Sequence, residues 1–297
     1  MANVVNVDGD VVAESDARIP VLDRGFLFGD SIYEVVRTHG DVPFGWPEHW
    51  QRLQRSADGL RLRLDLDEAA LARRIAATLR AADHGDSYVR VVVTRGSGKA
   101  PNIDLAYAPG PPRWIVMVRP LVPPSPDVRL CFVDRLRVDR RALDPATKSG
   151  NYLNSVLALA EAKDRGATDC LMCNGDGFVT EASTSNVWAR IDGVWCTPPL
   201  SAGILAGVTR ALLLEWLPTV GERAEERDLR PAELQRADEL FLSSTLRDIA
   251  PVSQLDGRPI GGPTARAPGL LARFRSHVAR RLHDHDTPAW RRLVGPA

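Results

Sequence analysis

The segment Asp144-Pro-Ala-Thr-Lys148-Ser-Gly-Asn-Tyr-Leu153 stands directly before a run of good helix formers, Ser155 to Lys163. We expect a helix from about Asn151 to Arg165, which places Lys148 just before its start, beside Gly150. A lysine at such a boundary can reach into a cavity with its amine while its backbone stays anchored, as a Schiff-base lysine requires. A surface lysine is the alternative that this segment by itself leaves open.

Lysine is rare in this chain. Only three of the 38 basic residues are lysines, and the others are arginines. Lys163 stands between Glu161 and Asp164 late in the expected helix, which predicts a solvated side chain. Lys99 falls in the Gly- and Pro-rich stretch from Arg95 to Pro112, which we expect to be a long loop. A reaction that needs a lysine amine therefore has three candidates.

Composition and charge argue against several classes of protein. Hydrophobic residues make up 44% of the 297 residues, and 38 Lys and Arg balance 38 Asp and Glu, so the formal net charge is zero. Binders of nucleic acid or of anionic membranes normally carry an excess of basic residues. The chain shows neither a signal sequence nor an apolar stretch of the ~18 residues that a membrane span requires. We therefore expect a cytoplasmic protein that binds no nucleic acid and no membrane.

The cysteines indicate no metal site. Cys170 and Cys173 form a single C-x-x-C in an apolar run, without a second pair of cysteines or histidines at the spacing of zinc ligands. We expect these two to be small residues in a strand. Together with Cys131 and Cys196 they are expected to be reduced thiols.

The first 119 residues alternate strand and helix signals, which predicts a small α/β domain. Val-rich runs flank Asp8-Gly9-Asp10, a hairpin signal, and two later segments repeat apolar residues at three- and four-residue spacing. The expected elements are a hairpin over 4–12, a helix opening at Asp30 or Ser31 within 29–38, helices over 47–60 and 67–82, and strands over 88–94 and 114–118.

A proline-rich stretch separates this part from the rest of the chain. Residues 120–127 contain four prolines, which remove backbone donors and stiffen the chain, so we expect an interdomain linker. Beyond it, Asn174-Gly-Asp-Gly177 and Asp192-Gly193 are turn signals between short apolar runs. We predict a larger, strand-rich domain over 128–297 with short helices, and hence an α+β architecture in two domains. The expected helices of this domain after the first are one from about residue 207, one over 232–237 and a final one over 269–283.

Two further segments and one arginine carry polar groups that suit a bound cofactor. Glu181 follows a strand and precedes Ala-Ser-Thr-Ser-Asn186, where it can keep a ring nitrogen protonated or simply cap a turn. Gly207-Val208-Thr209 opens a helix, so that backbone N–H groups and a hydroxyl form a potential anion site. Arg52 can bind an anion through two parallel hydrogen bonds. Each signal has an ordinary structural explanation when it is taken alone.

Read together, five segments in chain order carry a specific signal. They are Asp23–Asp30, His49–Leu53, Lys148–Leu153, Thr180–Asn186 and Gly203–Arg210. In this order they resemble the fold type IV pyridoxal-phosphate enzymes, which include the branched-chain aminotransferases, the D-amino-acid aminotransferases and the aminodeoxychorismate lyases. The resemblance runs from about residue 3 to residue 257.

The resemblance implies a fold and an assembly. It implies a small α/β domain, a larger strand-rich pseudo-barrel domain that binds pyridoxal 5′-phosphate, and an active site at the domain interface. In such enzymes a loop of a second subunit completes the site, so a homodimer is expected. The stretch from Arg95 to Pro112 is the expected contributor.

The resemblance also gives a role to each cofactor residue. Lys148 would form the Schiff base with the cofactor and then move the proton between the substrate carbon and C4′ of the cofactor. Glu181 would pair with the pyridine nitrogen. The phosphate would be held by Arg52, the backbone at Val208, Thr209 and Thr245, and Tyr152 would lie beside the cofactor hydroxyl.

The residues that select the substrate combine features of two subfamilies. Tyr33 and Val35 resemble the D-amino-acid aminotransferases, whereas Arg37 and Tyr88-Val-Arg90 resemble the branched-chain enzymes. The Arg-x-His pair with which many D-amino-acid enzymes bind the substrate carboxylate is missing. We infer that Arg37, Arg90 or Arg24 takes over this role. The expected substrate residues are Phe28, Tyr33, Arg37, Tyr88 and Arg90.

This combination favours a D-amino-acid transaminase that passes an amino group to a 2-oxo acid, with primary (R)-amines as a further donor class. A branched-chain L-amino-acid aminotransferase is the first alternative, supported by Arg37 and Arg90 and opposed by Val35. An aminodeoxychorismate lyase is the second, and it would need no 2-oxo acid. A non-catalytic homologue that only binds cofactor or partners is the third, and the intact Lys148 and Glu181 oppose it.

Overall fold

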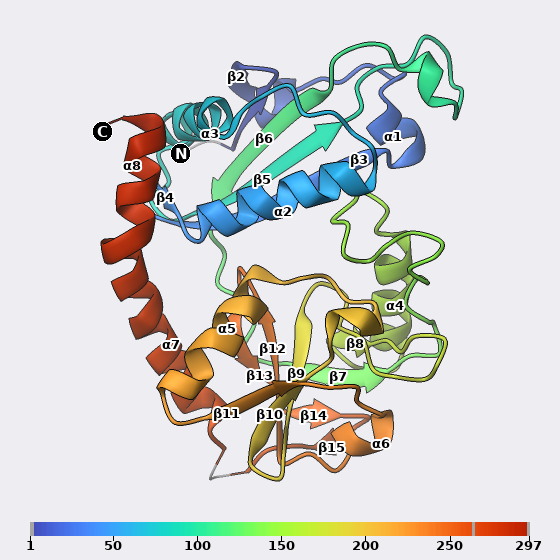
Figure 1. Cartoon of the computed structure of the whole chain (residues 1–297), viewed down its shortest axis with the longest axis vertical. Helices are drawn as coiled ribbons and strands as arrows, with labels where there is room; N and C mark the ends of the chain where they lie inside the picture. Colours follow the sequence, from blue (N-terminus) through green and yellow to red (C-terminus); the bar gives the residue numbers. More distant parts are fainter. Residues whose placement is uncertain (1–2, 263–264, 296–297) are drawn as a thin grey trace. The chain divides into compact units, whose positions relative to one another are not determined.

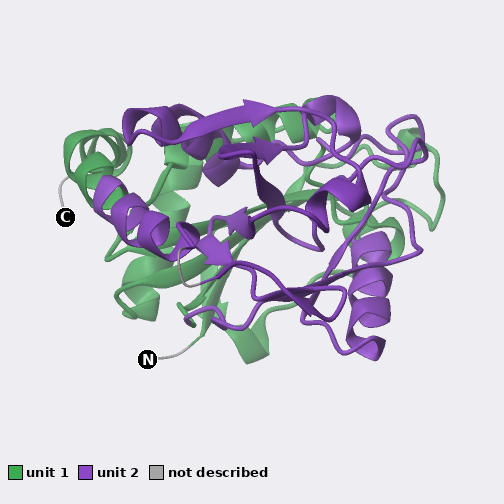
Figure 2. Ribbon diagram, turned by 90° about the horizontal axis from the view of Figure 1, so that it is seen from below, with its two compact units in different colours: residues 1–122, 147–151, 278–297 green, residues 123–146, 152–277 purple. Residues whose placement is uncertain are grey.

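The computed structural model describes residues 3–262 and 265–295, and the chain forms two compact units. Unit 1 comprises residues 1–122, 147–151 and 278–297, and unit 2 comprises residues 123–146 and 152–277 (Figure 2). The first division, after residue 122, falls within the stretch expected to be a linker. The segment 147–151 and the C-terminal residues group with unit 1, although the sequence prediction assigned both to the second domain. Composition marks boundaries along the chain, whereas compact units follow contacts between distant residues.

Unit 1 contains a six-stranded antiparallel sheet in the order β2-β1-β6-β5-β3-β4. Its strands are β1 (Val4–Val7), β2 (Asp10–Ala13), β3 (Ser31–His39), β4 (Val42–Pro43), β5 (Ser87–Thr94) and β6 (Arg113–Pro120). Along β5, buried and half-buried residues alternate, as they do when the two faces of a sheet differ in exposure. Figure 1 shows helix α2 (Trp46–Gly59) running alongside the strands β3 and β5.

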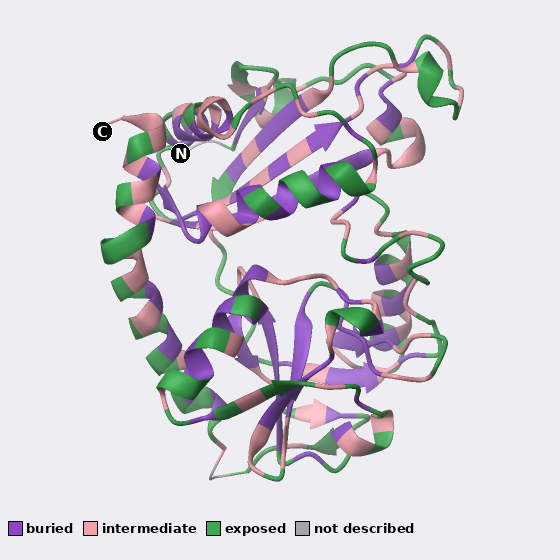
Figure 3. Cartoon of the chain, in the orientation of Figure 1, coloured by how far each residue is buried: buried purple, intermediate pink, exposed green. Residues whose placement is uncertain are grey.

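Helices of unit 1 bury one side and expose the other, as the burial colours of α2 show in Figure 3. Helix α3 (Glu68–Ala82) begins where the Asp67 carboxylate accepts a hydrogen bond from the N–H of Ala70 over 2.7 Å. It ends at Asp83, whose φ of 52° is left-handed. The other helical elements of unit 1 are α1 (Arg24–Phe28), the 3₁₀ turns Glu14–Asp16 and Leu105–Tyr107, the π-helical segment Leu282–Asp286 and α8 (Thr287–Val294).

Unit 2 contains two sheets. The five-stranded sheet has the order β11-β10-β9-β12-β13, and the four-stranded sheet has the order β15-β14-β7-β8. The strands are β7 (Arg129–Phe132), β8 (Asp169–Leu171), β9 (Asn186–Ile191), β10 (Val194–Thr197), β11 (Arg223–Glu226), β12 (Glu239–Ser244), β13 (Asp248–Pro251), β14 (Gln254–Leu255) and β15 (Arg258–Pro259). The helices are α4 (Leu153–Asp164), the 3₁₀ turn Leu200–Ala202, α5 (Val208–Thr219), α6 (Pro231–Leu234) and α7 (Ala267–Arg281), of which residues 278–281 are grouped with unit 1.

Both turn predictions in unit 2 are confirmed. The N–H of Gly177 donates to the carbonyl of Asn174 over 3.0 Å. Asp192 and Gly193 have φ of 50° and 75° between the antiparallel strands β9 and β10, as a type I′ hairpin requires.

The helix expected within residues 29–38 is wrong, because this segment forms the strand β3. The β-branched residues Ile32, Val35, Val36 and Thr38 disfavour a helix, and β5 pairs with β3 from Ser31 to Arg37. The local mixture of apolar and charged residues misled the prediction because Glu34, a charged residue, is fully buried. Within the described ranges, no helix has both the length and the apolar character needed to cross a membrane.

Candidate functional site

Lys148 stands on a short segment that lies beside β3 in unit 1. The N–H of Tyr33 donates to the carbonyl of Lys148 over 2.9 Å, and the N–H of Gly150 donates to the carbonyl of Ser31 over 2.8 Å. The N–H of Lys148 donates to Oγ of Ser56 on α2 over 3.0 Å. These hydrogen bonds hold the backbone of Lys148 against a strand and a helix, so that its side chain projects from a fixed point.

The amine of Lys148 meets two of the predicted substrate residues. Its Nζ lies 3.3 Å from the hydroxyl of Tyr33 and 4.3 Å from the centre of the Tyr33 ring. The guanidinium carbon of Arg90 lies 4.2 Å from the same ring centre. The Lys148 amine and the Arg90 guanidinium therefore both lie beside the ring of Tyr33, and all three residues belong to unit 1.

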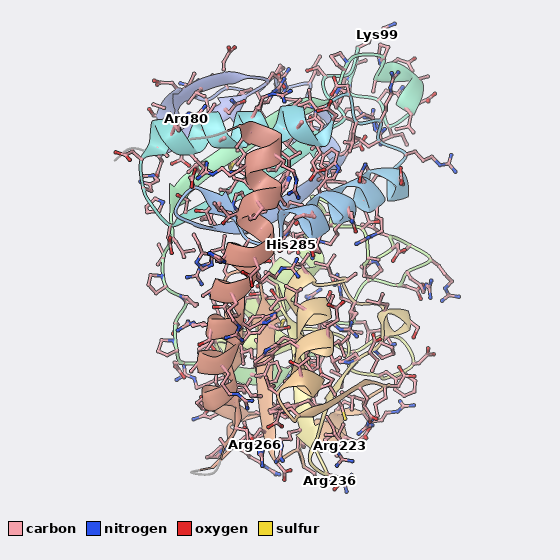
Figure 4. All side chains as sticks on the ribbon, turned by 60° about the vertical axis from the view of Figure 1, so that its left-hand side comes forward. Arg80, Lys99, Arg223, Arg236, Arg266 and His285 are labelled. Carbon is pink, nitrogen blue, oxygen red and sulfur yellow. The ribbon has the colours of Figure 1, made fainter. Side chains whose placement is uncertain are left out.

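The other two lysines are exposed. Lys99 lies in the 95–112 loop, where its side chain extends away from the ribbon (Figure 4). Lys163 is an exposed residue in the last turn of α4. Of the three lysines, all of which the structure describes, Lys148 is the one that combines partial burial with polar neighbours that can orient an amine.

Arg52 is part of a buried cluster of three polar side chains in unit 1. The Glu34 carboxylate accepts hydrogen bonds of 2.7 Å from Nε and from a terminal nitrogen of Arg52, and it lies 2.7 Å from Nδ1 of His49. None of the three side chains is more than 4% exposed. Burial opposes the ionisation of Glu34, but the charge and hydrogen bonds of Arg52, with His49, outweigh it and lower the pKa of Glu34 to about 2.

His49 remains neutral although it contacts a carboxylate. Burial lowers its pKa, the charges of Arg52 and Lys148 add to this effect, and Glu34 opposes it. A neutral His49 donates from Nδ1 to Glu34, which leaves its buried Nε2 without a hydrogen-bond partner among the described residues. The cluster therefore fixes Arg52 with two parallel hydrogen bonds in a defined orientation.

Other predicted substrate residues lie further away on the sheet or beside it. Arg37 faces Tyr88 in the β3–β5 register, four residues and thus about 13 Å along the strand from Tyr33. The Arg37 guanidinium lies 3.9 Å from the Asp86 carboxylate. Phe28 ends α1, with its ring centre 5.1 Å from the guanidinium carbon of Arg24.

Arg24 holds a loop in place. Its guanidinium donates to the Asp30 carboxylate over 2.9 Å and to the carbonyls of Asn102 and Ile103 over 2.5 and 3.0 Å. These donors are committed to the fold. Of the three arginines that the sequence allowed as carboxylate binders, Arg90 is therefore the one that the structure places beside the Tyr33 ring and hence near Lys148.

Glu181 lies in unit 2 and is 6% exposed. Its Oε1 lies 3.0 Å from Nε and 2.9 Å from a terminal nitrogen of Arg137. Its Oε2 accepts hydrogen bonds from Nδ2 of Asn186 over 3.2 Å and from the N–H of Leu205 over 3.1 Å. Four donors thus fix both oxygens of one carboxylate, which is more than a turn cap requires.

The residues of unit 2 that are predicted to bind the phosphate lie at the start of α5 and in the turn between β12 and β13. Val208 and Thr209 form the first turn of α5, where backbone N–H groups have no partner within the helix. A Cβ at Gly207, the residue before them, would overlap Oδ1 of Asn186. The Nδ2 of the same Asn186 side chain donates to the Glu181 carboxylate. Thr245 is half-buried in the turn between β12 and β13.

Tyr152 is half-buried and occupies the N-cap position of α4. The four cysteines are free thiols, and burial raises the pKa of Cys170 to about 12. Among the residues that the structure describes, no three His, Cys, Asp or Glu side chains gather as metal ligands would.

Sequence reasoning missed three residues of these clusters. They are Glu34, His49 and Arg137, of which His49 lies in one of the five motif segments without a role of its own. The signal for Glu34 was a carboxylate among β-branched residues, because a charge within a buried strand needs a partner. Nothing local marks Arg137 among the many arginines of this chain.

The comparisons with known proteins agree with the resemblance. Residues 31–255 match the family model described as amino-transferase class IV. A putative branched-chain-amino-acid aminotransferase of Methanocaldococcus jannaschii is 35% identical over 261 residues, which cover 86% of this chain and 89% of that protein. A D-alanine aminotransferase of Bacillus licheniformis is 31% identical, with coverage of 90% and 92%.

Solved structures show the same fold. The branched-chain aminotransferase of the thermophilic archaeon Thermoproteus uzoniensis, with norvaline, superposes with a TM-score of 0.88 at 28% identity and covers 98% of each chain. A second branched-chain amino acid aminotransferase, complexed with N-(5′-phosphopyridoxyl)-L-glutamate, superposes with a TM-score of 0.85. The family match spans most of the chain, and the curated relatives exceed 30% identity over nearly their whole length. This chain therefore belongs to the class IV aminotransferases, the fold type IV enzymes that use pyridoxal 5′-phosphate.

Proposed function

We propose that this class IV aminotransferase transfers an amino group between a D-amino acid and a 2-oxo acid, with Lys148 as its Schiff-base lysine. The observation that carries the proposal is the grouping of Lys148, Tyr33 and Arg90 in unit 1. An arginine near the reacting amine suits the α-carboxylate that every amino-acid substrate carries beside its reacting carbon.

The residues present fit the cofactor. Lys148 is the half-buried lysine with oriented neighbours, and the Glu181 carboxylate is preformed by four donors. At the start of α5, Gly207 lets the Asn186 side chain approach the backbone, because a Cβ there would overlap its Oδ1, next to the N–H groups of Val208 and Thr209. This donor set matches a ring nitrogen and a phosphate.

When bound, the cofactor supplies an electron sink for the bond that breaks at the substrate carbon. With the cofactor in place, Nζ of Lys148 would accept the proton from that carbon as a general base and would donate it again from the same nitrogen as a general acid. Tyr33, 3.3 Å from the amine, orients it. In this proposal Arg52, which Glu34 holds, the first turn of α5 and Thr245 would bind the phosphate, and Tyr152 would interact with the cofactor hydroxyl.

D-amino acids are favoured over branched-chain L-amino acids by Val35, where branched-chain enzymes usually have glycine, and by the similarity to a D-alanine aminotransferase. The branched-chain alternative is supported by Arg37 and Tyr88-Val-Arg90, and by the similarity to the archaeal relative. Primary (R)-amines belong to the donor classes to be tested.

We further propose a cytoplasmic homodimer. The four unpaired cysteines suit a reducing compartment. The 95–112 loop exposes Ile103, Leu105 and Tyr107, with 79% of Ile103 accessible, and such apolar side chains suit an interface with a second copy. Sedimentation velocity measures the assembly, and a monomeric active enzyme would contradict the dimer.

The test of the substrate is the visible absorbance of the loaded enzyme during single half-reactions with D-alanine and with L-leucine. Conversion of the cofactor band by D-alanine alone is expected, whereas conversion by L-leucine alone would refute the D-specific proposal in favour of the branched-chain one. Formation of pyruvate from aminodeoxychorismate without a 2-oxo acid would indicate the lyase.

Variants test the role of Arg90 in the same assay. Arg90→Gln is expected to lower kcat/KM for D-alanine by about tenfold to hundredfold, since it removes a charged hydrogen-bond donor from the carboxylate. Arg80→Gln is the matched control, because Arg80 is exposed on α3 (Figure 4). Equal turnover by both variants would exclude Arg90 as the carboxylate-binding residue.

A further inference from the structure

We infer that Arg137 is a positioning residue for the cofactor, which sets the carboxylate of Glu181 in the orientation that the pyridine nitrogen requires. The inference rests on the role proposed above for Glu181. It adds a residue that neither the sequence motifs nor the comparisons single out.

The contact between the two side chains is close and sheltered. Nε of Arg137 lies 3.0 Å from Oε1 of Glu181, and a terminal nitrogen lies 2.9 Å from the same oxygen. The side chains of Arg137 and Glu181 are 14% and 7% exposed. A charge-assisted contact of this kind is stronger and more directional than a bond between neutral groups.

The opposite oxygen is held by neutral groups. Oε2 accepts from the Asn186 amide over 3.2 Å and from the backbone N–H of Leu205 over 3.1 Å. With Arg137 on Oε1, the carboxylate can neither rotate about its last bond nor move sideways. Without Arg137, Oε1 would lose its charged donors, and only one of the two oxygens would remain fixed.

The backbone around Arg137 is itself clamped. The N–H of Arg137 donates to the carbonyl of Cys173 over 2.8 Å. The Asn154 side chain forms hydrogen bonds with the residues on either side of Arg137. Its Nδ2 donates to the carbonyl of Leu136 over 3.0 Å, and its Oδ1 accepts from the N–H of Val138 over 3.3 Å. A guanidinium that starts from a fixed backbone loses little further freedom when it orients its partner.

A nearby arginine shows what an ordinary surface pair looks like in this segment. Arg135 is 45% exposed, and its Nε lies 3.9 Å from the Glu161 carboxylate. Such a pair contributes little to stability. Arg135 is therefore a matched control with the same side chain two residues away.

The experiment measures cofactor binding and not only turnover. The apoproteins of the natural chain and of Arg137→Gln, Arg137→Lys, Arg135→Gln and Glu181→Gln are titrated with pyridoxal 5′-phosphate, while visible absorbance and visible circular dichroism are recorded. The dichroism of the bound cofactor reports how its ring is held, which a purely structural role of Arg137 would leave unchanged.

Arg137→Gln is expected to raise the Kd for the cofactor about tenfold or more and to reduce the visible dichroism. Arg137→Lys keeps the charge but lacks the planar fork, so it is expected to fall between Arg137→Gln and the natural chain. Arg135→Gln should stay within about twofold of the natural chain.

A Kd within about twofold and an unchanged dichroism for Arg137→Gln would overturn the inference. If this variant does not fold, Arg137→Lys decides by the same two readouts, and failure of both to fold would show a structural role and overturn it as well. Glu181→Gln separates the role of Glu181 from that of Arg137. If Glu181→Gln also leaves the Kd and the dichroism unchanged, the proposed role of Glu181 is wrong. If Glu181→Gln changes both strongly while Arg137→Gln changes neither, only the inference about Arg137 is wrong.

Discussion

Replacing Glu34 by glutamine is expected to destabilise unit 1 strongly. The Glu34 carboxylate is 1% exposed and contacts Arg52 twice and His49 once, each over 2.7 Å. Glutamine has nearly the same shape, but it carries no charge and replaces one acceptor oxygen by an NH₂ donor. Glu34→Gln therefore removes the counter-charge that Glu34 gives to the buried guanidinium of Arg52 and turns one contact into a meeting of two donors.

The magnitude follows from two independent arguments. Removal of one partner of a buried ion pair costs about 3 to 5 kcal/mol. Folding also lowers the pKa of Glu34 from 4.5 to about 2, against burial and because of Arg52 and His49. At about 1.4 kcal/mol per pKa unit, this corresponds to roughly 3 kcal/mol of stability at neutral pH. The free energy of unfolding of Glu34→Gln should therefore be lower by about 3 kcal/mol or more.

The assay is equilibrium unfolding in urea at about pH 7.5, followed by tryptophan fluorescence, to which Trp46, Trp50, Trp114 and Trp290 of unit 1 and three tryptophans of unit 2 contribute. Glu14→Gln is the matched control, because Glu14 forms a surface ion pair with Arg119 and its side chain is 32% exposed. The control should lose far less stability than Glu34→Gln, because water screens a surface pair. Equal losses for the two variants would contradict this prediction, since they would mean that the buried pair contributes no more than the surface pair.

Three more predictions concern pH and glycine. Burial lowers the pKa of His49 in the folded chain, so near pH 6.5 the unfolded chain takes up a proton at this residue before the folded chain does. Stability should therefore fall by up to about 1.4 kcal/mol per pH unit as the pH drops below 6.5, until the folded His49 is protonated too, and urea titrations of His49→Asn should lack this part of the slope. Gly207→Ala should weaken pyridoxal 5′-phosphate binding in a spectroscopic titration by about tenfold or more, because the new Cβ would overlap Asn186, whose amide also donates to the Glu181 carboxylate. Unchanged binding would contradict the phosphate site proposed at the start of α5. Gly96 and Gly85 have φ of 80° and 75°, but of these two only Gly96 has a backbone carbonyl where a Cβ would lie. Thermal unfolding should therefore show a larger loss of stability for Gly96→Ala than the ~1 kcal/mol expected for Gly85→Ala. Equal losses would exclude the close approach of the carbonyl to Gly96.

Some parts of the fold could be predicted because their causes are local. The cap residue Asp67 and the apolar spacing after it determine α3, and Asp192-Gly193 determines a hairpin, since few other residues adopt left-handed φ at two consecutive positions. The family could be predicted for a different reason: five motifs in a fixed order occur together far too seldom by chance.

Other parts depend on residues that are distant in sequence. The strand β3 carries a buried glutamate that only Arg52 and His49, 15 to 18 residues away, make tolerable. Unit 1 also includes the π-helical segment Leu282–Asp286, where Asp286 accepts a hydrogen bond from the N–H of Gly45 across 241 residues. Local patterns contain no information about such partners, and the sequence prediction was wrong about the helix over 29–38 for this reason.

For the candidate site, the residue types available can be read from the sequence: three lysines, Glu181 after a strand, and a glycine before a helix start. The tertiary structure decided which of them are held. Lys148 and Tyr33 are 115 residues apart and meet because residues 147–151 pair with β3, and Arg137 reaches Glu181 across 44 residues because its backbone is clamped. Hydrogen bonds are directional and short, so a site depends on the placement of backbones within a few tenths of an ångström, and that placement is a property of the packed fold.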